Sequence, residues 1–154
     1  MKKIVLSMFL IFAMSIIQIS AKADSTPLPS NNASWLEILN YYRQSSGLSP
    51  VTEDEQMTDG AQKHAIYLSK TSTSYFVNEY QNLHQENPAS PFYSQEGINF
   101  GAGNITWGNS LFPRPIDGLM TAPFHAIGFL REGLKKVGFG SAVVEQSGVY
   151  PGTQ

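Results

Sequence analysis

The sequence predicts a single domain of the mixed α+β class. Two successive segments, within residues 34–46 and 52–69, combine helix-capping signals with apolar residues at helical spacing and therefore predict helices. A later run of β-branched and aromatic residues that contains two glycines, residues 137–144, predicts a strand. The length of 154 residues allows one compact core and is too short for two domains.

The composition excludes several classes of protein. With 42% hydrophobic, 12% aromatic and 14% charged residues, the chain is too apolar to be intrinsically disordered. The absence of cysteine excludes a disulfide framework, a thiolate zinc site and a cysteine nucleophile. A formal net charge of −2 provides no electrostatic attraction for nucleic acid, so we expect no nucleic-acid partner.

The N-terminus has the three parts of a signal peptide. Lys2 and Lys3 precede an apolar run over residues 4–19, and Ala21-Lys22-Ala23 provides a cleavage site, so we predict a signal peptide over residues 1–23. The alternative is an uncleaved membrane anchor, but the run is shorter than the ~18–20 residues of a spanning helix. Cleavage leaves seven basic and twelve acidic residues, a net charge of about −5. We therefore expect a secreted or periplasmic bacterial protein without a stable membrane anchor after cleavage.

The first predicted helix has a well-defined start. Residues 24–33 are rich in Pro, Ser and Asn and predict a flexible leader. Ser34 and Glu37 then form a capping box, in which each side chain can bond the backbone N–H of the other residue. Gly47 ends the apolar pattern, so the helix is expected over about residues 35–46.

The second helix and the middle of the chain follow. Thr52 and Glu55 form another capping box, which predicts a helix over about residues 53–69. Residues 75–83 are compatible with a short helix. Residues 84–109 are rich in Pro, Gly, Asn and Ser and predict a long, functional or partly structured loop.

The last third of the chain predicts two short helices before the strand. Pro115 suits a helix start, Pro123 interrupts that helix, and a further helical turn follows. We place the folded domain at residues 34–145 and expect an irregular tail over residues 146–154. Common hydrolase and phosphate-binding motifs are absent from the sequence.

Three ordered groups of residues together resemble a known family. The first comprises Leu-Asn-Tyr-Tyr-Arg at residues 39–43, Gly-Leu-Ser-Pro at 47–50 and Ala-Gln-Lys-His-Ala-Ile-Tyr-Leu at 61–68. The second is His84 with residues 91–97, and the third combines Met-Thr-Ala-Pro-Phe-His at 120–125 with Val-Gly-Phe-Gly at 137–140. This order resembles the CAP superfamily (cysteine-rich secretory proteins, antigen 5 and pathogenesis-related proteins, or SCP domain), in its exported bacterial branch.

The resemblance implies a fold and a site. It implies an α-β-α sandwich with a central antiparallel sheet, here expected to lack the last strand, and a cleft lined by histidines and acids. His84 and His125 match two histidines that hold a divalent metal such as zinc in the family, which also uses two glutamates. Gly103 stands where the first of these glutamates belongs, and Asp117 is the only acid near the second position. The cleft candidates are therefore His84, Glu96 and His125, and the candidate metal ligands are His84 and His125.

Other readings of these residues stay open. His64 lies beside an apolar helix stripe and is expected to pack rather than to bind a ligand, and Glu96 and Glu86 can be ordinary surface acids. Two imidazoles and a carboxylate could hold Zn²⁺ and activate a water for hydrolysis, whereas two imidazoles alone bind a metal weakly.

Three functions are compatible with the sequence. The leading one is a non-enzymatic extracytoplasmic binding or interaction module with a His-lined cleft, for a small apolar molecule, a metal, or an envelope or host component. The alternative is a metal-dependent hydrolase that uses His84 and His125, with Glu96 as a possible ligand or base and with no catalytic residue assigned. The third is a truncated remnant without function.

Overall fold

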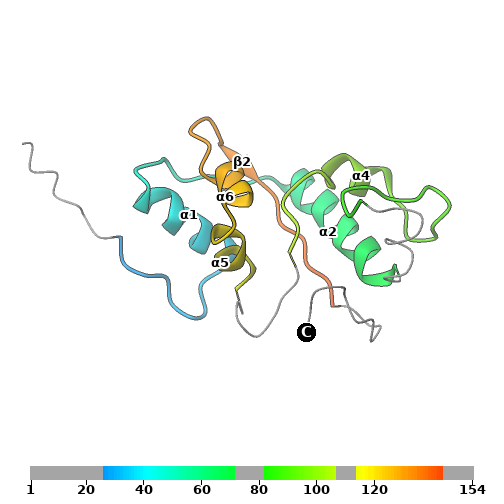
Figure 1. Ribbon diagram of the computed structural model, residues 1–154, viewed down its shortest axis with the longest axis horizontal. Coiled ribbons are helices and arrows are strands. Elements are labelled where there is room, and N and C mark those ends of the chain that lie inside the picture. Colours follow the sequence, from blue (N-terminus) through cyan, green and yellow to red (C-terminus); the bar gives the residue numbers. More distant parts are fainter. Residues whose placement is uncertain (1–25, 72–81, 107–113, 144–154) are drawn as a thin grey trace, which may run out of the picture.

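The computed structural model describes residues 26–71, 82–106 and 114–143, which contain five helices and two short strands. Helices α1 (Trp35–Ser45), α5 (Pro115–Met120) and α6 (Pro123–Phe129) form one group, and α2 (Glu55–Lys70) and α4 (Gln95–Phe100) form the other (Figure 1). Between the two groups runs the chain that begins at strand β2 (Lys136–Val137). The predicted signal peptide, most of residues 75–83 and the tail 146–154 lie outside the described residues.

Helix α1 confirms the predicted capping box. The Ser34 hydroxyl accepts a hydrogen bond from the Glu37 N–H at 3.2 Å, and the Glu37 carboxylate accepts one from the Ser34 N–H at 2.7 Å. Hydrogen bonds with the Ser34 backbone and hydroxyl also lower the pKa of Glu37. Beyond the helix, Gly47 has φ = 74°, a left-handed conformation that favours glycine at this position.

Helix α2 begins two residues later than its expected start, and the predicted cap was wrong. The N-cap is Asp54, whose carboxylate accepts hydrogen bonds from the N–H groups of Gln56 and Met57. Thr52 is unavailable for capping because Thr52–Glu53 form strand β1, which pairs with β2. A sheet contact between residues 84 positions apart therefore decides where this helix begins.

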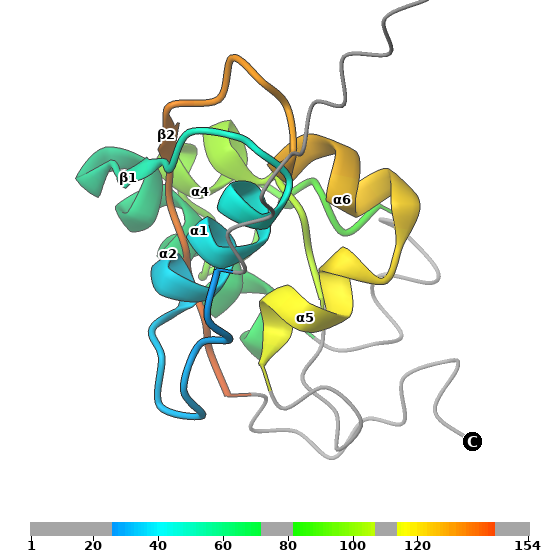
Figure 2. The same ribbon diagram turned by 90° about the vertical axis from the view of Figure 1, so that its left-hand side faces the viewer.

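The described sheet is parallel, not antiparallel as the family resemblance led us to expect. Thr52 pairs with Lys136 and Glu53 with Val137 in a two-stranded parallel ladder. Parallel strands need a long crossover between them, and the chain from α2 to α6 supplies it. The mixed α+β class is retained, with helices on both sides of the β2 segment (Figures 1 and 2).

Of the predicted strand over residues 137–144, Val137 belongs to β2, whereas residues 138–143 form an extended segment that lies against α2 and residue 144 lies outside the described residues. A Cβ on Gly138 would clash with the backbone of Met57, and one on Gly140 would clash with the backbone of Ala61. The glycines do allow close backbone packing, as expected, but their partner is the backbone of a helix. This contact holds the segment beside the N-terminal half of α2.

Two of the shorter helices were expected and one was not. Both α5 and α6 begin with a proline at the first position, where its missing N–H costs nothing. Helix α4 lies inside the predicted long loop, and its N-cap Ser94 accepts a hydrogen bond from the Gly97 N–H at 2.9 Å. In the parts of the chain that the structure describes, no helix is long and apolar enough to cross a membrane.

The core beneath α1 is small and is secured by a buried arginine. Ile38, Leu39, Val51 and Ile116 are each at most 3% exposed, and burial of each side chain contributes about 1.5–3 kcal/mol. The guanidinium of Arg43 is completely buried and donates hydrogen bonds to four backbone carbonyls, those of Ser49, Phe129, Arg131 and Leu134. Arg43 thereby connects α1 to the end of α6 and the turn before β2.

Candidate functional site

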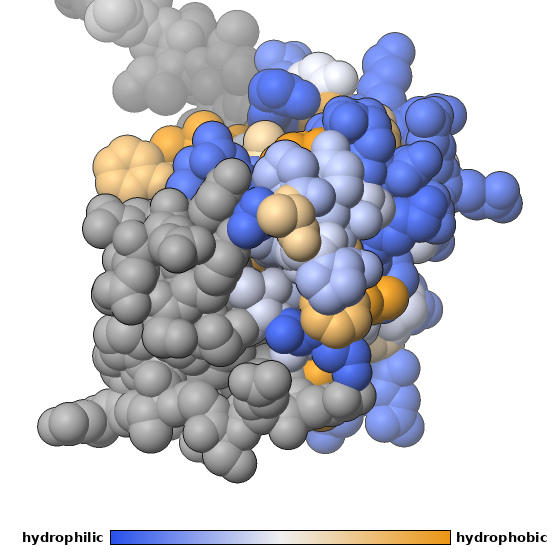
Figure 3. Space-filling view, turned by 90° about the vertical axis from the view of Figure 1, so that its right-hand side faces the viewer, coloured by the Kyte–Doolittle hydropathy of each residue, from blue (hydrophilic) through white to orange (hydrophobic). Residues whose placement is uncertain are grey.

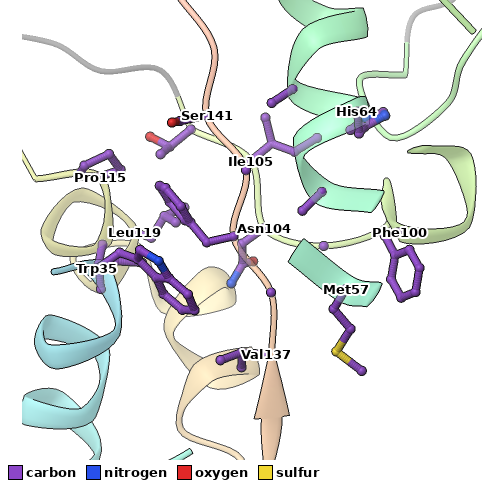
Figure 4. Close-up of a pocket in the computed structure, with 18 of the residues that line it drawn as sticks. Trp35, Met57, His64, Phe100, Asn104, Ile105, Pro115, Leu119, Val137 and Ser141 are labelled. Carbon is purple, nitrogen blue, oxygen red and sulfur yellow. The ribbon is translucent and has the colours of Figure 1, made fainter. Parts of the chain in front are cut away.

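An apolar cavity separates the two groups of helices. Its volume is about 690 Å³, and its walls include Trp35, Leu39 and Leu119 on one side and Met57, Ala61, Ala65 and Leu68 on the other. Figure 4 shows the labelled side chains of both walls, with Ile105 and Val137 between them. The extended segment after β2 lines the same space through residues 138–142.

An aromatic pair connects the α1 wall to this segment. The rings of Trp35 and Phe139 stack with their centroids 5.3 Å apart and their planes 16° from parallel. Such a pair contributes about 0.5–1.5 kcal/mol beyond simple burial. Trp35 is therefore held in place at the cavity wall.

Beside the cavity, His64 and Glu86 form a buried polar pair, which the sequence did not indicate as a pair. The Nδ1 atom of His64 lies 2.8 Å from Oε1 of Glu86, and its Nε2 lies 2.9 Å from the Leu83 carbonyl oxygen. The other Glu86 oxygen accepts a hydrogen bond from the Ser94 N–H at 2.8 Å. Glu86 is 3% and His64 4% exposed.

The partners of His64 determine where its protons lie. A carbonyl oxygen only accepts hydrogen bonds, so Nε2 carries a proton that it donates to Leu83. A second proton lies between Nδ1 and Oε1 of Glu86, on one atom or the other. Both nitrogens of His64 are thus occupied, which agrees with its expected packing role and leaves no lone pair for a ligand.

His84 lies at the surface with one of its two nitrogens engaged. Its Nδ1 is 2.8 Å from the Gly101 carbonyl oxygen, and a carbonyl only accepts, so Nδ1 carries the proton. Within the described residues, no hydrogen bond engages Nε2. In the neutral form of the ring, this tautomer places the lone pair on Nε2.

His125, on α6, is oriented in the same way by Asn104. The Asn104 amide nitrogen donates to the His125 carbonyl at 3.1 Å, which leaves its oxygen facing Nδ1 of His125 at 2.9 Å. Nδ1 is therefore the protonated nitrogen, and no hydrogen bond among the described residues engages Nε2. The structure thus attaches His84 and His125 to the same short segment, residues 101–104.

The acids expected at this site are engaged elsewhere. The Glu96 carboxylate lies 3.6 Å from the Lys63 ammonium on the surface between α2 and α4. Asp117 accepts hydrogen bonds from Tyr42 and Arg114, and partial burial together with this hydrogen bond raises the pKa of Tyr42. In the part of the chain with a described structure, no three His, Asp or Glu side chains form a cluster that could hold a metal. The described residues therefore do not fit the metal site that the resemblance implied.

The role of Glu86 could not be read from local sequence. It lies 22 residues from His64, in a loop whose path is fixed only by the fold. The role of Asn104 likewise depends on a contact with α6, 21 residues away.

Comparison with known proteins identifies the family. The family model described as "CAP: Cysteine-rich secretory protein family" matches residues 36–150. No curated protein and no solved structure matches the chain. Because the match covers more than half of the 154 residues, the chain belongs to the cysteine-rich secretory protein (CAP) family.

Proposed function

We propose that this CAP-family chain is an exported, non-enzymatic binding module whose ligand site is the apolar cavity between the two helix groups. The observation that carries this proposal is the cavity itself, about 690 Å³ in volume and lined largely by apolar side chains. Small-ligand sites typically have volumes of about 300–1,000 Å³. Protein interiors leave few spaces larger than a water molecule, so a space of this size supports a binding role.

The polar groups around the cavity support binding rather than catalysis. His64 reaches the cavity wall with both nitrogens bonded, so it is poorly suited to act as a base. Asn104, which also lines the cavity, is bonded to His125 through both its side-chain oxygen and its nitrogen. A catalytic site needs a nucleophile or base with an orienting partner and a free position for the substrate.

The binding role is tested with N-phenyl-1-naphthylamine, a neutral apolar fluorophore, on the protein purified after expression of the full chain. We expect saturable binding of one molecule with energy transfer from tryptophan. Ala65→Phe, which places a ring in the cavity, should weaken binding at least tenfold. Ile66→Phe is the matched control because Ile66 is exposed on the same helix. No saturable binding by a protein that melts cooperatively would refute the proposal.

Export is tested on the protein recovered from the producing cells. Mass spectrometry of the extracytoplasmic fraction should find a chain that begins at Asp24. A chain that retains residues 1–23 in the membrane fraction would instead support the anchor. Only an extracytoplasmic chain is consistent with the proposed module.

The second candidate, a metal-dependent hydrolase, is favoured by one observation. Nε2 of both His84 and His125 is unengaged within the described residues, and metal-binding histidines commonly donate their other N–H to a protein acceptor. Zinc calorimetry on the protein and on its His84→Ala/His125→Ala variant tests this role. Micromolar binding that is lost in the variant would favour the hydrolase, and absence of binding would eliminate it.

A further inference from the structure

The extended segment that starts at β2 has one side with hydrogen-bonding partners. The Val137 carbonyl accepts a hydrogen bond from the Asp54 N–H at 2.8 Å, and the Phe139 N–H donates to the Thr58 hydroxyl at 3.3 Å. Farther along, the Gln62 amide bonds both the N–H and the carbonyl of Ser141, at 3.1 and 2.8 Å. The backbone groups of residues 137, 139 and 141 are thus directed to β1 and α2.

The opposite side of this segment is open. In an extended chain, successive residues direct their N–H and C=O groups to alternate sides. Within the described structure, no hydrogen bond engages the backbone N–H or C=O of Lys136, Gly138, Gly140 or Ala142. Gly138, Gly140 and Ala142 also line the apolar cavity. The cavity is therefore bordered by an unpaired strand edge about 20 Å long, at about 3.3 Å per residue.

The polarity of this edge distinguishes between possible occupants. An edge presents alternating N–H and C=O groups, whose partial charges are complemented by the edge of another polypeptide strand. A hydrocarbon ligand would cover these groups without bonding them, and each buried unbonded group costs about 1–3 kcal/mol. An extended peptide offers both the hydrogen bonds and the side chains for the cavity walls.

The walls define the peptide further. A strand beside this segment would have the Trp35 and Leu119 wall on one face and the Ala65 and Leu68 wall on the other. Strands covered on both faces consist of nearly continuous apolar residues. After the predicted cleavage the chain has a net charge of about −5, which favours basic residues at the ends of the peptide. In contrast, the described residues on the face seen in Figure 3 are mostly hydrophilic.

We propose that the cavity is an acceptor site for an added β-strand, and that its ligand is an extended apolar peptide with basic ends that pairs with the open edge of residues 136–142. This inference rests on the proposed binding function and names the ligand class for the same cavity. It adds a third strand, next to β2, to the two-stranded sheet of the described structure.

Amide exchange measured by NMR tests the pairing directly. The probe is the peptide acetyl-Lys-Val-Ile-Val-Thr-Val-Lys-amide, and its control carries N-methyl groups on alternate residues, so that it cannot donate to the edge. We expect the first peptide to slow exchange at Gly138, Gly140 and Ala142 at least tenfold, with little change at Phe139 and Ser141. The methylated peptide should leave all five amides unchanged.

A matched pair of variants tests the same edge by affinity. Ala142→Pro removes an N–H on the open side, whereas Val143→Pro removes one on the opposite side of the segment. We expect several-fold weaker binding of the probe peptide to the Ala142 variant and unchanged binding to the Val143 variant.

The possible failures can be told apart. Binding of the naphthylamine without protection of the edge amides by the peptide would overturn the strand proposal and leave the apolar binding module intact. Equal binding of the methylated peptide would also overturn it, because side-chain burial alone would then explain the affinity. If neither probe binds the folded protein, both proposals fail.

Discussion

Replacement of Glu86 gives the sharpest test of the architecture around the cavity. Glu86→Ala leaves Nδ1 of His64 and the N–H of Ser94 buried without a partner. Removing one member of a buried charged pair typically costs about 3–5 kcal/mol. Small domains are stable by about 5–15 kcal/mol, so this variant should lose a large share of its stability.

Glu86→Gln separates the contribution of the hydrogen bonds from that of the carboxylate charge. The glutamine amide can donate to Nδ1 of a neutral His64 and its oxygen can accept from Ser94, so every hydrogen bond is retained. The variant loses only the contribution of the charge to these hydrogen bonds. A hydrogen bond to a charged group contributes about 1.5–3 kcal/mol and a neutral one about 0.5–1.5 kcal/mol. The glutamine variant should therefore be destabilised by only about 1–2 kcal/mol.

Urea unfolding of the three proteins, followed by circular dichroism, provides the comparison. We expect the alanine variant to be less stable than the glutamine variant by about 1–4 kcal/mol, the difference between the two costs above. Equal stability of the two variants, or an alanine variant as stable as the unmodified protein, would refute the assigned hydrogen bonds.

Three further predictions concern other parts of the structure. Arg43→Lys should lower the free energy of unfolding in urea by about 1–3 kcal/mol, because one ammonium cannot reach all four carbonyls. An unchanged free energy of unfolding would contradict the hydrogen bonds assigned to the Arg43 guanidinium. The hydrogen bond from Lys136 lowers the pKa of Asp54 in the folded protein. The Asp54 carboxylate therefore stabilises the fold fully above its unfolded pKa of about 3.9, and this stabilisation is lost as pH falls through the lower folded pKa. Asp54→Asn should therefore reduce the urea midpoint at pH 7 and have progressively less effect below pH ~4; an effect independent of pH would exclude this ion pair. Gly103→Glu should fold normally, because a Cβ at this position meets only the Phe100 carbonyl oxygen, at 3.5 Å. In calorimetry this variant should bind zinc more tightly than the unmodified protein. Unchanged zinc affinity would place His84 and His125 outside a common site.

The parts of the fold that the sequence predicted correctly depend on short-range contacts. The capping box of α1 joins residues three positions apart, and the prolines that start α5 and α6 act through their own backbone. The start of α2 was misplaced because β1 pairs with a strand more than 80 residues later. Residues 138 and 140 predicted close backbone approach, but sequence alone does not distinguish a neighbouring strand from the helix that they contact.

In the candidate site, too, the sequence indicated individual residues but not the contacts between residues far apart in the chain. The sequence pointed to His84 and His125 through the family resemblance, and to His64 as a packing residue. It did not reveal that Glu86 is the acid buried beside His64, because no periodic pattern joins two residues 22 positions apart across a loop. The apolar cavity was also beyond the sequence, since its walls come from segments distributed over more than 100 residues.

The hydrogen-bonding partners of the three histidines assign them to different roles. Both nitrogens of His64 are hydrogen-bonded, to Glu86 and to the Leu83 carbonyl, and these bonds connect the loop at residues 83–94 to α2. His84 and His125 each donate a hydrogen bond from Nδ1 to the segment 101–104, and no hydrogen bond among the described residues engages Nε2 of either ring. These hydrogen bonds orient the two rings. Gly103 lies in the same segment and offers no carboxylate, and within the described residues no acid completes a metal site with the two histidines. Among the described residues, the apolar cavity and the open edge beside it are the features that support the proposed binding role, because an apolar ligand with backbone hydrogen bonds would satisfy both of them.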